Sequence, residues 1–136
     1  MSETLSVLRE ALEERSRRTF DALEAHVRGR IPDVVARRGD WKNVNIPFVY
    51  YLSFRPNTDP ASESLDVVVT LHKEEGHYLL KAHASWSSGD LVFETGQLEI
   101  PWNQEHLLEV IERDLDRVFG EIVEEEEKIF HAIDGS

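Results

Sequence analysis

The stretch LDVVVTLHKEEGHYLLKAHASW, residues 65–86, decides the fold, because two strand-like segments flank a tight turn at Glu75-Gly76. Apolar residues occupy the odd positions before this turn and the even positions after it. Alternation with a period of two is typical of strands with one buried face. A two-residue turn pairs the two apolar sets, whereas a slip by one residue would set Val69 against Lys81. The pattern therefore predicts an antiparallel hairpin in the register that pairs the two apolar sets, with Val69 opposite Ala82.

A second turn at Ser88-Gly89 predicts that the chain continues into another strand of the same sheet. This turn sets Trp86 opposite Leu91 and Ala84 opposite Phe93, and the glycine supplies the positive φ of a tight hairpin. Beyond Phe93 the apolar phase changes. We therefore expect a bulge near Thr95-Gly96, which would return the later apolar residues Leu98 and Ile100 to the inner face.

Helical spacing of apolar residues predicts a helix over about residues 3–28 and a second over about 103–133, which Asn103 would cap. Strands are expected at about residues 46–55, 64–73, 77–86 and 91–100. Pro47 places the first strand at a sheet edge or marks its beginning. Asp33 to Arg38 is expected to form a short helical turn. The sequence thus predicts one α+β domain over residues 1–136, a two-layer fold with a four-stranded antiparallel meander in the order 1-2-3-4 and both helices on one face.

The predicted C-terminal helix has a consequence for oligomeric state. An unbroken helix would be about 45 Å long, against about 33 Å for strands of ten residues. Its end would overhang the sheet unless it bends at Gly120. An overhang would expose Ile129, Phe130 and Ile133, so the sequence predicts that a second copy covers them in a homodimer.

Charge limits the kinds of partner. The net charge is −12, and residues 56–136 hold 19 acidic against 5 basic residues. Such a surface repels phosphate backbones, so we expect no nucleic-acid partner. Two interpretations of the acidity stay open: it supports solubility, including in a salt-adapted organism, or it attracts a basic protein partner.

Composition also bears on location. The chain has no cysteine, no long uncharged apolar run and no apolar segment near its N-terminus. The predicted setting is therefore the cytoplasm, with no membrane association.

The search for chemistry assigns no catalytic residue, metal ligand or cofactor. His72, His77 and His83 lie on one predicted hairpin, but no two of them are directly opposed. Ser85 lies two residues from His83 without the sharp turn or oxyanion donors that nucleophilic catalysis needs. These observations favour a non-enzymatic protein over an enzyme.

Two candidate binding surfaces follow. The favoured hypothesis is a homodimeric protein-interaction module whose partner docks on the outer sheet face or on the overhanging helix. The alternative is a small-molecule binder or enzyme with an aromatic cleft between sheet and helices. The docking residues would be Val49, Tyr51, Val68, Leu79 and Val92 of the sheet with Ile129, Phe130 and Ile133 of the helix; the cleft residues would be Tyr50, Phe54, Tyr78, Trp86 and Phe93.

Overall fold

The computed structural model describes residues 2–40, 46–56, 62–102 and 106–135, and the side chains of residues 2–4 are excluded. Asn103, the predicted N-cap, lies outside these ranges. In chain order the elements are α1 (Ser2–Arg30), β1 (Val35–Asp40), β2 (Phe48–Arg55), β3 (Leu65–Lys73), β4 (His77–Trp86), β5 (Leu91–Glu94), β6 (Leu98–Pro101), α2 (Leu107–Glu124) and α3 (Glu126–Asp134).

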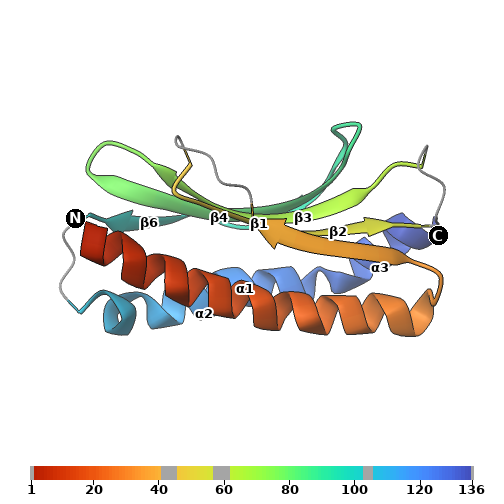
Figure 1. The fold of residues 1–136 in the computed structure, drawn as a ribbon, viewed down its shortest axis with the longest axis horizontal. Coiled ribbons are helices and arrows are strands. Elements are labelled where there is room, and N and C mark those ends of the chain that lie inside the picture. Colours follow the sequence, from red (N-terminus) through yellow and green to blue (C-terminus); the bar gives the residue numbers. More distant parts are fainter. Residues whose placement is uncertain (1, 41–45, 57–61, 103–105, 136) are drawn as a thin grey trace.

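The strands form one antiparallel sheet in the order β1-β2-β3-β4-β5, and β6 also pairs with β4. The helices lie against one face of this sheet, as Figure 1 shows, and the other face carries no helix. The predicted α+β class, the consecutive strand order and the packing of both terminal helices on the sheet are confirmed. None of the helices in the described ranges is long and apolar enough to cross a bilayer.

The hairpin of β3 and β4 has the predicted register. Val69 lies opposite Ala82, and Leu71 lies opposite Leu80. All four side chains are fully buried beneath the helices. Gly76 in the turn has φ 82°, a conformation that side chains with a Cβ rarely adopt. The apolar alternation therefore favoured this pairing, since a slip by one residue would have placed Lys81 in the core, and the two-residue turn excludes longer slips.

The second hairpin is confirmed only in part. Ala84 lies opposite Phe93 as predicted, but Leu91 lies opposite Ser85 and not opposite Trp86. The register shifts between Ala84 and Ser85, which leaves Val92 as an extra residue in β5. Such a bulge rotates the strand end away from the core, and the side chain of Leu91 is 57% exposed.

The expected return of the apolar residues after Phe93 is confirmed, although a break between two strands achieves it. Leu98 and Ile100 of β6 are buried and lie opposite Leu80 and Tyr78. At the break, the Thr95 amide donates to the Ala82 carbonyl at 2.9 Å, and the Ala82 amide donates to Thr95 Oγ1 at 3.0 Å. The Thr95 hydroxyl oxygen thus accepts the hydrogen bond that a backbone carbonyl of a neighbouring strand would otherwise accept.

The helical turn predicted at Asp33 to Arg38 is wrong, because most of this segment belongs to the edge strand β1. Its apolar alternation is weak, and its pairing with β2 supplies the order that the local sequence lacks. Arg38 points to the helix side, where it donates to Asp21 at 2.7 Å and to Glu24 at 2.8 Å on α1. Since β1 takes the edge, β2 is an interior strand that begins directly after Pro47.

The predicted single C-terminal helix is also wrong. It breaks at Glu125, whose φ and ψ are −95° and 8°, and Gly120 remains inside α2. After the break α3 lies along β5. Ile129, Phe130 and Ile133 are at most 8% exposed, so the expected overhang does not form. The change of direction allows the chain to cover these residues itself.

Candidate functional site

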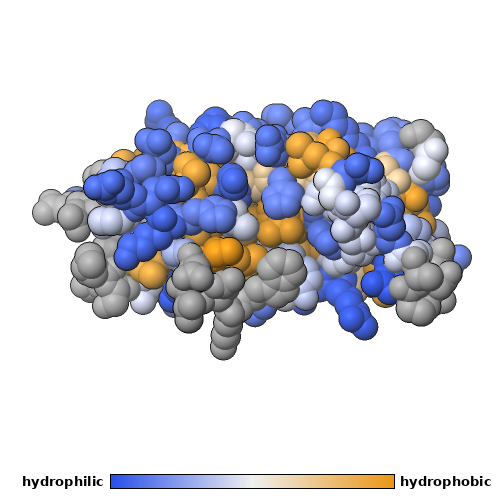
Figure 2. All heavy atoms as spheres, turned by 90° about the horizontal axis from the view of Figure 1, so that it is seen from above, coloured by the Kyte–Doolittle hydropathy of each residue, from blue (hydrophilic) through white to orange (hydrophobic). Residues whose placement is uncertain are grey.

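The sheet face without helices is the first candidate surface. Its side chains come from alternate positions of every strand, and Figure 2 shows apolar groups interspersed among hydrophilic ones. Across the middle strands one row runs Tyr51, Val68, His83 and Glu94. Tyr51 and Leu79, two of the five predicted docking residues of the sheet, are partly exposed there, whereas Val92 is partly buried against the hydrophobic core. The mixture of apolar and charged groups resembles the surface of a transient protein contact more than a core.

The prediction that all five apolar residues are open to solvent is wrong for two of them. Val49 is 3% exposed and Val68 is 7% exposed. Both lie on strands that have a paired strand on each side, Val49 on β2 and Val68 on β3. Cross-strand neighbours on the same face cover side chains in such positions. The accessible apolar surface is therefore smaller than the sequence predicted.

Two histidines of this face have altered acidity. Burial lowers the pKa of His72 and of His83, and the positive charge of Lys81 lowers both further. The carboxylates of Glu94 and Asp66 oppose this effect at His83. The imidazoles are therefore mainly neutral at neutral pH, so acidic side chains carry more charge on this face than the histidines do.

Metal ligation has no site in the part of the chain that the structure describes. No group of three or more histidine and carboxylate side chains there is arranged to hold an ion. His83 lies opposite Val68, as the register predicted, and His72 lies opposite Leu79.

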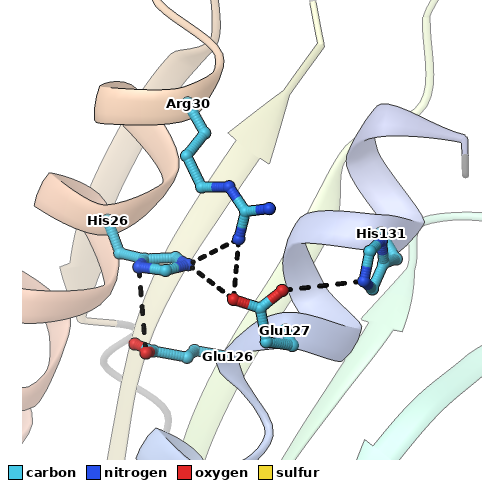
Figure 3. Close-up of polar contacts among 5 residues, drawn as sticks. All are labelled: His26, Arg30, Glu126, Glu127 and His131. Carbon is cyan, nitrogen blue, oxygen red and sulfur yellow. Dashed lines mark hydrogen bonds and ion pairs between the residues drawn. The ribbon is translucent and has the colours of Figure 1, made fainter.

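A polar cluster joins the end of α1 to α3 and forms the second candidate site (Figure 3). Arg30 donates to Glu127 Oε1 at 2.7 Å, and His26 Nε2 lies 3.4 Å from the same oxygen. The other ring nitrogen of His26 is 3.8 Å from Glu126 Oε1. His131 Nε2 lies 3.6 Å from Glu127 Oε2. The hydrogen bond from Arg30 is the main cause of a lowered pKa at Glu127.

Phe130 fixes the position of this cluster. The Arg30 guanidinium carbon lies 3.5 Å from the centre of the Phe130 ring, a cation–π contact. His26 meets the same ring edge-on at a centroid distance of 6.5 Å. The cluster therefore fastens α3 to α1, and it accounts for the burial of the residues that the sequence had assigned to an overhang. Its groups satisfy one another, which favours a structural role.

The five residues of the predicted aromatic cleft lie on the inner sheet face but take part in core packing. Phe54, Tyr78 and Phe93 are at most 7% exposed and belong to the hydrophobic core. Tyr50 and Trp86 are partly buried against that core. Tyr50 stacks on Phe20 of α1 with ring centroids 5.6 Å apart. Ligand binding at these residues stays a prediction.

A groove between α1 and α2 is the third candidate site, and the sequence analysis missed it. It contains one hollow of about 290 Å³ next to Ala22 and Val123, and another of about 260 Å³ next to Ala11 and Leu108. Arg15 lines both hollows and forms an ion pair with Asp116 across the groove. The sequence signal that could have located this groove is the apolar stripe of α2, because it includes two residues that are exposed in the structure, Leu108 and Val123.

No known family, no curated protein and no solved structure matches the chain. Its function must therefore be argued from the surfaces described above.

Proposed function

We propose that the protein is a non-enzymatic interaction module of the cytoplasm that acts as a homodimer and binds a basic protein partner on its outer sheet face. The observation that carries this proposal is a sheet with helices on one side only, whose other side presents partly exposed apolar residues. Tyr51 and Leu79 supply apolar contact area there. The charged and polar groups between them would form the rim that partner surfaces commonly have.

The net charge of the whole chain supports a basic partner. On this face Asp66, Glu94 and Glu99 lie among the basic residues Arg37, Arg55 and Lys81. Residues 56–136, which form β3 to β6 and also α2 and α3, carry a net charge of −14. A field of one sign raises the association rate with a partner of the opposite sign and disfavours acidic competitors.

The test compares capture by matched variants. Tyr51→Thr with Leu79→Thr removes apolar area from the outer face while keeping residues that favour strands. Val110→Thr is the control, because Val110 is 54% exposed on α2, far from this face in the fold. Each protein is immobilised and exposed to lysate of the source cell at increasing salt, and the retained proteins are identified.

The proposal predicts that a basic protein binds the wild type and the control, elutes as salt rises, and is lost from the double variant. Purified wild-type complex should then protect β3, β4 and β5 from modification of outer-face side chains. If the double variant retains the same proteins as the wild type, or if the retained proteins are acidic, the outer face is not the docking surface.

A further inference from the structure

The groove between α1 and α2 has an apolar rim that its own protomer does not cover. Leu108 and Val123 of α2 are each 42% exposed, and each borders one of the two hollows. On the α1 side the hollows are lined by the small residues Ala11 and Ala22. The large side chains of α2 project and the small residues of α1 leave hollows. A second pair of helices can fit its projecting side chains into such hollows.

The two sides of the groove carry opposite charge. Arg15, Arg18 and Glu14 line it from α1, so this side has a net positive charge, and the Arg18 side chain is 68% exposed. Glu109, Glu112 and Asp116 line it from α2. In a two-fold contact whose axis runs parallel to the helices, the basic side of one protomer faces the acidic side of the other, and this favourable pairing occurs twice.

Overall charge also limits where two copies can touch. Each chain carries a net charge of −12, so most approaches between copies are repulsive. Helix α1 holds six of the 15 lysine and arginine residues and is the longest element of the fold. Six acidic residues balance these on α1, so a contact of α1 with the acidic α2 of another copy is less repulsive than a contact between two copies of α2.

We infer that this groove is the contact between two copies of the chain, with α2 of each copy lying along α1 of the other. This inference rests on the homodimer of the proposed function and adds its surface. The 18 residues of α2 span about 27 Å, and two adjacent helices are about 20 Å wide, so the projected face is roughly 540 Å² per copy. Side-chain relief increases that area toward the ~800 Å² per partner of a standard stable interface.

The first test is the mass of the full chain in solution by light scattering. The wild type should have twice the monomer mass of 15.7 kDa. Leu108→Lys with Val123→Lys should raise the dissociation constant roughly 1000-fold, because each substitution occurs twice in the contact. Val110→Lys is the matched control on the same helix, more exposed but not part of the groove lining, and should remain dimeric. Circular dichroism verifies that both variants are folded.

The second test uses the absence of cysteine from the chain. Arg18→Cys and Glu112→Cys are prepared as separate proteins, mixed and mildly oxidised. Because each protein has a single thiol, a mixed disulfide requires that α1 of one copy meets α2 of another. The mixed product should exceed both like-with-like products, and it should not form when Val110→Cys replaces Glu112→Cys.

The results distinguish the homodimer itself from the surface through which it forms. A monomeric wild type overturns the homodimer and this surface together. A dimeric wild type whose mass is unchanged by the two lysines, and which gives no mixed disulfide, overturns the surface and leaves the homodimer standing.

Discussion

Thr95 offers a sharp test of how the sheet is held together at the break between β5 and β6. Its side chain is 8% exposed, and its hydroxyl oxygen accepts the Ala82 amide proton at 3.0 Å. The Ala82 side chain is fully buried. Thr95→Val keeps the shape of the side chain but removes this acceptor, so the Ala82 amide loses its partner in a place that water does not readily reach.

The expected loss follows from this one group. A buried amide without a partner costs about 1–3 kcal/mol, so we expect Thr95→Val to lower the free energy of unfolding by about 2 kcal/mol. With an unfolding entropy of about 2.1 cal/mol/K per residue, that loss lowers Tm by about 7 °C for a chain of 136 residues. Thr95→Ser keeps the hydroxyl and loses only a methyl group, which costs about 0.8 kcal/mol.

Thermal unfolding and urea titration of the three proteins measure the difference, and hydrogen exchange reports on the amide itself. The Ala82 amide should exchange faster in Thr95→Val than in Thr95→Ser. The reasoning is refuted if the valine variant is as stable as the serine variant, or if exchange at Ala82 is the same in both.

Three further predictions concern the contacts between layers. The pKa of Glu24 is lowered, chiefly because Arg38 donates a hydrogen bond to it. The ionised Glu24 therefore stabilises the fold fully at pH values above its ordinary pKa of 4.5, and this contribution is lost as the pH falls through the lowered pKa. Arg38→Met should therefore cost about 1–2 kcal/mol at neutral pH, with a smaller difference in acid, as urea titrations at several pH values would show; an equal cost at every pH would contradict this. Ser16→Ala should raise stability by up to about 1 kcal/mol, because the buried Ser16 hydroxyl has no hydrogen-bond partner among the residues that the structure describes, and a fall in Tm would contradict this. Phe130→Leu should cost about 1 kcal/mol more than Phe119→Leu in thermal unfolding, since only the first removes the ring beneath Arg30; equal losses would contradict a stabilising cation–π contact.

The hairpin of β3 and β4 was predictable because a slip by one residue buries Lys81 and the tight turn at Glu75-Gly76 allows no longer slip. Local pattern and turn chemistry agreed there, and the glycine of the turn has the positive φ that the turn required. The N-terminal helix was predictable for a similar reason, since its apolar stripe extends over many turns. Consistency over a long segment leaves few alternatives.

The edge strand β1 and the break at Glu125 were not predictable from their own residues. Val35–Asp40 contains two arginines and a glycine, and only its pairing with β2 and the ion pairs of Arg38 make it a strand. At Glu125 the sequence is a run of acids that suits a continuous helix. The contact of Phe130 with Arg30 joins residues 100 positions apart, so no local window contains it.

The candidate surfaces divide in the same way. Alternation along the strands identified which residues face away from the helices, but the burial of Val49 and Val68 depended on how side chains of neighbouring strands pack across that face. The groove between α1 and α2 brings together segments about 100 residues apart, such as Arg15 and Asp116.

The amino-acid sequence alone determined the antiparallel sheet, the inner and outer sides of its strands and the helical ends of the chain, because side-chain periodicity acts over neighbouring residues. Only the tertiary structure decided that the chain covers its own C-terminal apolar residues and leaves a groove between its helices. Those features depend on packing and ion pairs between segments that lie far apart in the chain, and no short stretch of sequence contains both of the segments in contact.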